Sequence, residues 1–355
     1  MAPHWGRGGK MGQINNTDKI NIGVPYKIED TLRRDAELFE VYKGDSTEIN
    51  RNHFLNQLIL GYYRNYKKER NESVAKVKGI LYPYLQDPKR QNELAEKLME
   101  DVVLPEVPKR KGKNPVRLPL KPTLETDQFI TEIRESGEQV AQYLCRMFMS
   151  YCEKPIYERE RIIFRDKVKF LEEACIDKTE ICITISTSPG VIHRVIPYEL
   201  SVGAEEMSNY LLFQEFRSAS GRNEAVSCRL CRIRSFSYSE TSGTLEPDVV
   251  RFLELMKKRG PQYAIKAESE SCVRLTPSGQ GRYRLIYFAR PAVDRIEKLE
   301  NGDALYYFSA APDLVFRYFI RFNAGEAEII SPPELRDRIH MHFRESVLPY
   351  ESDQE

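Results

Sequence analysis

A short alternating segment near the N-terminus constrains the fold more than any other part of the sequence. In the segment DKINIGVPYKIED, apolar residues alternate with polar or small ones before a proline and the start of a helical pattern. Alternate residues of a strand share a face, so Ile20, Ile22 and Val24 point one way, while Lys19 and Asn21 point the other. Because a strand this short cannot hold a sheet alone, we expect it to pair with a second strand.

Two helical patterns follow this strand. In YKIEDTLRRDAELFEVYKG the apolar residues have helical spacing, and Gly44 is expected to end the helix. Asn50 is a suitable N-cap for the next helix, STEINRNHFLNQLILGYYRNYKKER, and one or two more helices are expected from Glu72 to Val103. A strand, a helix, a turn and a capped helix resemble a ribbon-helix-helix unit, in which two short strands form one antiparallel ribbon.

A second segment repeats this order. In NPVRLPLKPTLETDQFITEIRESGEQVAQYLCRMFMSYCEKP, Val116, Leu118 and Leu120 alternate with other residue types, and Gly137 separates two helical patterns. The two halves would then form a pseudo-dimer within one chain. An ordinary helical connector is the alternative, and Pro119 limits the pairing because it has no N–H to donate. The sequence alone leaves both interpretations open.

The charge of the chain is unevenly distributed. The net charge is only +1, but residues 1–123 carry 23 basic and 16 acidic side chains, and the remainder carries 31 basic and 37 acidic ones. A basic N-terminal third favours a polyanionic partner, although the excess is modest. From Lys109 to Lys121 there are six basic residues and no acidic one, which fits either a solvated linker or a nucleic-acid clamp.

Three features of the sequence are typical of a cytoplasmic protein: its apolar runs, its N-terminal segment and its cysteines. No apolar run approaches the length that spans a membrane, and the N-terminal segment MAPHWGRGGKMGQ lacks the hydrophobic core of a signal peptide. Seven cysteines, an odd number, lie mostly within apolar runs. This pattern indicates reduced, buried thiols rather than a disulfide framework.

The middle of the chain changes from helices to strands. The segment ERIIFRDKVKFLEEACIDK predicts one amphipathic helix, and four strand-like runs follow it: EICITIS, VIHRVIPYELSV, SNYLLFQEF and VSCRLCRIRSF. One helix followed by short strands predicts a small, strongly bent antiparallel barrel. The last third starts with a helix that has Pro247 in its first turn and Gly260 beyond its end, and it continues as a compact α/β unit.

These middle and final sections resemble the WYL-domain family. The Trp-Tyr-Leu strand of that family matches Asn209, Tyr210 and Leu211, the segment IPYEL resembles its proline-containing strand, and CRLCRI resembles its Phe-Arg-Leu-Asp-Arg-Ile strand. The closing GEAEIISPPELRDRIHMHF resembles the extension often found after WYL domains, so the match covers about half of the chain. Asn209 stands in place of the Trp, and Val226 falls where an Arg is usual.

The resemblance implies a fold and a function. WYL domains resemble Sm-type barrels and are associated with sensing nucleic-acid-like ligands. A ribbon-helix-helix segment in front of a WYL domain is similar to the WYL accessory proteins of type VI-D CRISPR systems, which bind single-stranded RNA and enhance the RNA-guided RNA nuclease. It therefore implies a non-catalytic accessory protein that has single-stranded RNA and such a nuclease as partners, and we expect a homodimer. A ligand-sensing transcriptional regulator that binds duplex DNA, and a pure protein adaptor, are the alternatives.

We predict an α+β multidomain chain with a helical ribbon-helix-helix region, an Sm-like antiparallel barrel and a C-terminal α/β extension. The expected divisions are a disordered tail at 1–16, the ribbon-helix-helix and helical region at 17–103, a basic linker at 104–115, a second ribbon-helix-helix-like unit at 116–165, a WYL domain at 166–245 and its extension at 246–355.

The residues that we expect to bind single-stranded RNA are aromatic or positively charged. Bases stack on aromatic rings and cations hold phosphates, so single-stranded RNA binding needs both kinds of side chain. The WYL-like region supplies His193, Arg194, Tyr198, Tyr210, Arg229 and Arg232. Ordinary strand packing for the tyrosines, and solvated or ion-paired positions for the arginines, are the alternatives.

A second candidate surface is the polar face of the ribbon. Lys19 and Asn21 could read base edges of duplex DNA, while the start of the second helix, at Asn50, Arg51 and Asn52, could meet phosphate. The alternative for this surface is a role in dimerisation or protein docking only.

Signals for catalysis are weak. The Cys-x-x-Cys of CRLC has no second pair to complete a zinc site, and the two imidazoles of HMH lie on different sides of a helix. The sequence contains no His-Glu-x-x-His, no phosphate-binding loop and no Gly-x-Ser-x-Gly elbow. We therefore expect no metal, no cofactor and no enzymatic activity.

Overall fold

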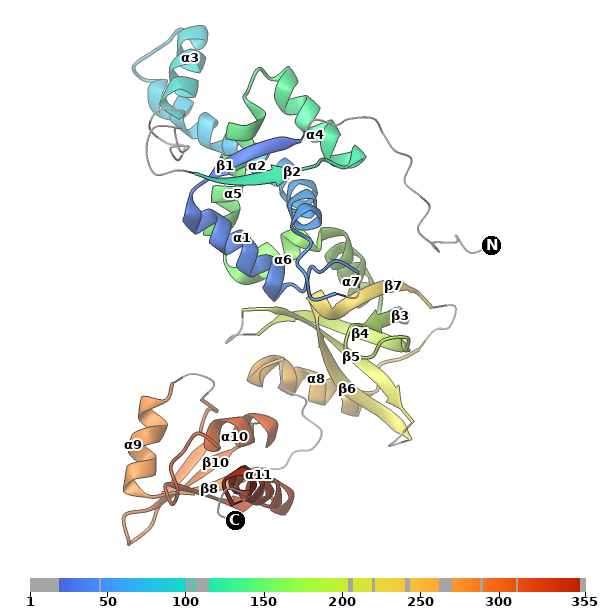
Figure 1. The fold of residues 1–355 in the computed structure, drawn as a ribbon, viewed down its shortest axis with the longest axis vertical. Coiled ribbons are helices and arrows are strands. Elements are labelled where there is room, and N and C mark those ends of the chain that lie inside the picture. The colour runs from blue at the N-terminus through green and yellow to red at the C-terminus, as the bar shows by residue number, and fades with distance from the viewer. Residues whose placement is uncertain are drawn as a thin grey trace. The chain divides into compact units, whose positions relative to one another are not determined.

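The computed structural model describes residues 19–44, 46–99, 102, 105, 115–203, 207–218, 221–239, 243–261, 270–287, 290–310 and 312–351. Within these residues the chain is a mixed α+β protein with 11 α-helices and three antiparallel sheets (Figure 1). The chain divides into two compact units, Met1–Arg165 and Asp166–Glu355, called unit 1 and unit 2 below. The expected tail at 1–16 and most of the expected linker at 104–115 lie outside the described residues.

Unit 1 contains a two-stranded ribbon and helices. In chain order its elements are β1 (Ile20–Val24), α1 (Tyr26–Leu38), α2 (Arg51–Leu81), α3 (Pro88–Leu98), β2 (Val116–Leu120), α4 (Leu124–Glu135), α5 (Val140–Glu153) and α6 (Ile156–Ile163).

The expected pairing of the two short strands is confirmed. Strands β1 and β2 are antiparallel and pair from Ile20 opposite Leu120 to Val24 opposite Val116 without a register shift (Figure 1). The side chains of Ile22 and Leu118, which are 0% and 1% exposed, lie on the inner face of this ribbon. Pro119 is compatible with the pairing because both strands of a two-stranded ribbon are edge strands.

Helix α2 is longer than expected. Its N-cap is Asn50, as predicted, and the Asn50 side chain accepts a hydrogen bond of 3.1 Å from the backbone N–H of His53. The helix continues for 31 residues to Leu81, so no separate helix begins at Glu72. No proline interrupts this stretch, and Ser73 bonds back to the carbonyl of Glu69, so the helical hydrogen bonds continue.

A buried ion pair connects three helices of unit 1. Asp35 of α1 is 2% exposed, and its two carboxylate oxygens accept hydrogen bonds of 2.8 and 2.9 Å from the guanidinium of Arg159 in α6. The hydroxyl of Tyr151 in α5 also donates to Asp35, at 2.9 Å. Burial raises the pKa of Asp35, while the hydrogen bonds from Arg159 and Tyr151 act in the opposite direction.

Unit 2 begins with a helix and a five-stranded antiparallel sheet in the order β6-β5-β4-β3-β7. In chain order its first elements are α7 (Arg165–Asp177), β3 (Ile181–Ile185), β4 (Ile192–Val202), β5 (Asn209–Arg217), β6 (Arg222–Arg229), the short 3-10 helix η2 (Leu230–Arg232), β7 (Ile233–Tyr238) and α8 (Pro247–Arg259). Helix α8 covers β5 and β6 with Val249, Leu253 and Met256.

In the described residues the strands of the predicted barrel form an antiparallel sheet, and no barrel is found. Closure requires the two edge strands to pair, and no pairing between β6 and β7 is found there. Instead, η2 interrupts the single strand that was expected over VSCRLCRIRSF. Leu230 and Cys231 of η2 are both fully buried.

The single helix expected over ERIIFRDKVKFLEEACIDK is also divided. Helix α6 ends at Ile163, and Phe164 leaves helical geometry before α7 begins at Arg165. The ring of Phe164 packs edge-on against Phe39, which is fully buried, with ring centroids 6.3 Å apart. Tertiary packing of an aromatic residue therefore overrides a continuous helical pattern at this point.

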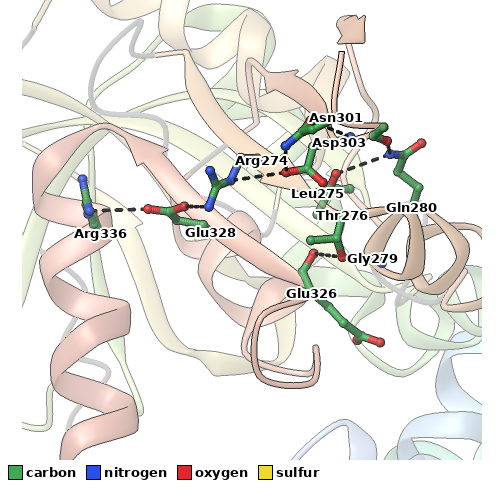
Figure 2. A network of polar contacts seen from close by, with 11 residues as sticks. Arg274, Leu275, Thr276, Gly279, Gln280, Asn301, Asp303, Glu326, Glu328 and Arg336 are labelled. Carbon is green, nitrogen blue, oxygen red and sulfur yellow. Dashed lines mark hydrogen bonds and ion pairs between the residues drawn. The ribbon is translucent and has the colours of Figure 1, made fainter. Parts of the chain in front are cut away.

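The rest of unit 2 forms a four-stranded antiparallel sheet in the order β11-β8-β10-β9 with helices. Its elements are β8 (Ser271–Leu275), α9 (Pro277–Leu285), β9 (Arg295–Lys298), β10 (Ala304–Phe308), α10 (Pro312–Phe319), β11 (Ala327–Ser331) and α11 (Pro333–Glu351). Figure 2 shows polar contacts that connect these elements: Arg274 of β8 pairs with Glu328 of β11 at 2.5 Å, and Glu328 in turn contacts Arg336 of α11 at 3.4 Å.

The register of the ribbon predicts that substitutions at two neighbouring positions of β1 differ in their effect on stability. Ile22→Asp should lower the free energy of unfolding of the full chain by at least about 3 kcal/mol, because it places an unpaired charge on the buried face. Asn21→Asp, on the exposed face of the same strand, should change it by less than about 0.5 kcal/mol. Chemical denaturation monitored by circular dichroism measures both values, and equal effects would contradict the ribbon register.

Candidate nucleic-acid interface

Unit 2 contains a hollow of about 560 Å³ beside the five-stranded sheet. Four of the six residues predicted to bind RNA line it: His193 of β4, Tyr210 of β5, Arg229 of β6 and Arg232 of η2. The break at η2 is what turns the chain between the two arginines. The hollow therefore gathers residues from four separate elements of the sheet region.

The other two predicted residues lie elsewhere. Arg194 is exposed and does not line the hollow, because it follows His193 on the same strand and points to the opposite face. Tyr198 lies where the pairing of β4 with β5 shifts register, and it packs against the cluster under α8. Its hydroxyl donates to Glu254, and this hydrogen bond raises the pKa of Tyr198 to about 12.

Four residues singled out by the WYL-like motifs have defined positions in or beside the hollow. Tyr210 is 5% exposed, so it forms part of the wall of the hollow rather than an open platform for a base. Arg229 is half-buried, and its Nη2 donates to the hydroxyl of Ser208 at 3.0 Å. Asn209, in place of the family's Trp, is fully buried, and Val226, in place of its Arg, lines the hollow.

Local sequence patterns did not indicate Ser188 and Arg217, which line the hollow, or Glu215, which contacts His193 and Arg217. The Ser188 hydroxyl lies 2.8 Å from His193 Nε2, and Glu215 Oε1 lies 2.6 Å from His193 Nδ1. The other oxygen of Glu215 pairs with Arg217 at 2.7 Å. These residues come from the β3–β4 turn and from β5, and only the strand register brings them to His193, so no local pattern could have identified them.

A larger hollow, of about 770 Å³, lies in unit 1. Its basic residues face acidic ones: Arg70 donates to Glu138 at 2.5 and 2.6 Å, and Lys67 pairs with Glu132 at 3.3 Å. Arg70 and Lys67 are therefore held in ion pairs with acidic residues of the same unit.

The outer face of the ribbon carries the second set of predicted residues. Lys19 and Asn21 are exposed there, and Arg117 of β2 lies opposite Gly23 on the same face. The residues predicted at the start of α2 have structural contacts instead. Asn50 caps the helix, Arg51 pairs with Glu29 at 3.1 Å, and Asn52 exchanges two hydrogen bonds with the backbone of Lys121.

Among the residues with a described position, no group of three or more His, Cys, Asp or Glu side chains could hold a metal ion. Cys228 and Cys231 of the CRLC segment are buried, and every cysteine of the chain is free of disulfide bonds. In the described part of the chain, none of the helices is both long enough and apolar enough to cross a membrane.

Comparisons with known proteins show similarity at the level of structure. No protein-family model matches the chain, and no curated protein matches it. A crystal structure described as a CRISPR Cas-related protein is similar, with a TM-score of 0.67, 19% identity and 95% of each chain covered, which shows a shared fold. Proteasome accessory factor B/C (PafBC) of Arthrobacter aurescens has a TM-score of 0.25 at 10% identity over 98% of this chain and 52% of that one. Nothing follows from a TM-score that low.

The two hydrogen bonds of Asn52 predict a structural role for this side chain. Asn52→Ala should lower the free energy of unfolding by about 0.5–1.5 kcal/mol, because the Lys121 N–H loses its side-chain acceptor while the Lys121 carbonyl keeps only Asn56 as a side-chain donor. Lys19→Ala, an exposed control on β1, should have almost no effect on stability. Thermal and urea denaturation of the full chain test this difference, and an Asn52→Ala variant of unchanged stability would contradict it.

Proposed function

We propose that the protein is a non-catalytic, single-stranded RNA-binding accessory protein that enhances an RNA-guided type VI-D CRISPR RNA nuclease. The observation that carries this proposal is the gathering of positive charge around the hollow of unit 2. Arg217, Arg229 and Arg232 line it together with His193, and Arg317 of α10 also contributes to the lining.

The chemistry of this lining suits an RNA backbone. A guanidinium binds a phosphate through paired hydrogen bonds, and several guanidiniums around one hollow favour a ligand with repeated negative charge. The buried ring of Tyr210 supplies an apolar wall against which a ribose or base edge can pack. RNA binding of this kind is governed mainly by phosphate contacts and depends strongly on salt.

Two independent observations support the CRISPR context of this proposal. The WYL-like motifs, together with the ribbon, resemble the accessory proteins of type VI-D systems. The chain also shares its fold with a CRISPR Cas-related protein over 95% of its length. We also propose that the protein is a homodimer, and light scattering of the purified protein tests this oligomeric state.

The lining of the hollow indicates which arginines should contribute to the affinity for single-stranded RNA. Arg229→Ala with Arg232→Ala should weaken binding of single-stranded RNA about tenfold and lower the salt slope by about 1.4, because two phosphate contacts are lost. The control is Arg194→Ala with Arg234→Ala, which removes the same charge from exposed strand positions outside the hollow. Fluorescence anisotropy at several salt concentrations measures both variants.

The same two variants separate RNA binding from enhancement of the nuclease. In a target-RNA cleavage assay with an RNA-guided type VI-D nuclease, the wild type and the control should raise the cleavage rate, and the hollow variant should not. If the hollow variant and the control bind RNA equally, with both still folded by circular dichroism, the hollow is not the RNA site.

A ligand-sensing regulator that binds duplex DNA is the second candidate function, because the ribbon exposes Lys19, Asn21 and Arg117 on one face. If that face reads bases, Lys19→Ala with Asn21→Ala should abolish sequence-specific duplex binding, since each good base contact contributes about 1–3 kcal/mol of discrimination. Under the RNA proposal the same change should leave single-stranded RNA affinity nearly intact. Selection of bound duplexes from a random pool, followed by binding of the enriched sequence, distinguishes the two functions.

A further inference from the structure

The hydrogen-bonded chain from Ser188 through His193 to Glu215 gives the hollow a specific ligand chemistry. We infer that the hollow binds a phosphate group of RNA with the protonated form of His193, and that Glu215 is the residue that positions His193 for this role. The inference rests on the proposed function, because it concerns the same hollow and the same RNA backbone.

The partners of His193 determine which hydrogen bonds it can make. The carboxylate of Glu215 is 7% exposed, pairs with Arg217 at 2.7 Å and can only accept, so His193 Nδ1 carries a hydrogen and donates to it. When the imidazole is neutral, its Nε2 has no hydrogen and accepts from the Ser188 hydroxyl. In that state the hydrogen of Ser188 is occupied and cannot be offered to a phosphate oxygen.

Protonation reverses the hydrogen bond between His193 and Ser188. The imidazolium donates from both ring nitrogens, so Nε2 donates to the Ser188 oxygen, and the Ser188 hydrogen becomes available to a ligand in the hollow. The protonated state thus provides one more positive charge and one more donor than the neutral state. Both changes favour a phosphate, so phosphate binding and protonation of His193 should be coupled.

The charged groups around His193 come from several elements. Glu215 and Arg217 approach from β5, Arg229 from β6, Arg232 from η2 and Arg317 from α10. The only carboxylate that contacts His193 in the described structure is that of Glu215, and it favours the imidazolium, whereas the arginines oppose it. Glu215 therefore fixes the orientation of the imidazole through its contact with Nδ1.

The same order of serine, histidine and carboxylate occurs in serine hydrolases. In those enzymes backbone N–H groups and short polar side chains stabilise the reacting oxyanion. Here four arginines line the same hollow as the serine, and guanidiniums match the charge and the planar hydrogen-bonding geometry of phosphate oxygens. The lining therefore favours phosphate binding by this chain of residues over nucleophilic attack.

The test measures binding of oligouridine at constant ionic strength from about pH 8 to about pH 5.5, the range in which imidazoles titrate. Uracil does not take up protons in this range, so changes belong to the protein or the phosphates. Wild-type affinity should rise about tenfold towards the acidic end. His193→Gln should lose most of this rise, and Glu215→Gln should move it to lower pH. Ser188→Ala should reduce the affinity at the acidic end while keeping part of the pH dependence.

His340→Gln is the matched control, because it removes an exposed imidazole of unit 2 outside the hollow, and its pH profile should equal that of the wild type. Calorimetry in buffers of different ionisation enthalpy should show uptake of up to about one proton on binding, lost in His193→Gln. Thermal unfolding of each variant verifies that it is folded at each pH used.

Identical pH profiles for the wild type and His193→Gln would overturn the inference. If the Arg229 and Arg232 variant still loses affinity in that case, the proposed RNA site stands and only the coupling to His193 fails. If that variant binds RNA as well as its control does, the proposed function fails independently of the pH profile.

Discussion

The architecture of unit 1 depends on backbone pairing between two strands that lie far apart in the sequence. Neither β1 nor β2 is long enough to be stable alone, and a two-stranded ribbon is marginal unless its apolar face is covered. The ribbon residues Ile22 and Leu118 supply that face. Because α1 follows β1 directly and α4 follows β2 after a short connection, the pairing also determines where these helices begin.

Side-chain amides secure the junction between the ribbon and the helices. Asn52 and the almost fully buried Asn56 of α2 donate to the carbonyl of Lys121, directly after β2. Asn56 also accepts from Thr123 and Thr126 at the start of α4, where Thr123 and Thr126 form a capping box. The buried Asn56 amide thereby provides partners for backbone groups that are costly to leave unsatisfied when they are shielded from water.

Two of the buried carboxylates in the described structure, Asp35 and Glu215, bind an arginine with different consequences. Asp35 binds Arg159 and Tyr151 inside unit 1, where the ion pair connects helices and has a structural role. Glu215 binds Arg217 and His193 at the edge of a hollow, where the partners of the carboxylate can also reach a ligand. A buried charge is tolerated only when it is paired, and in unit 2 the pairing also orders the residues that would meet RNA.

The sequence by itself determined the elements whose signals are local. The period of two in β1 and β2, the N-cap at Asn50 and the proline and glycine around α8 follow from the chemistry of neighbouring residues, and the structure has them where the pattern indicates. The rings and cations of the WYL-like region also indicated His193, Tyr210, Arg229 and Arg232, which the fold brings to one hollow. Tertiary structure decided the rest. The helix break at Phe164 and the interruption of the strand at η2 result from burial against distant residues, which outweighs local preference. The roles of Asn52, Ser188, Glu215 and Arg217 depend on strand register and helix packing, because their partners lie many residues away and only the folded chain places them within hydrogen-bonding distance.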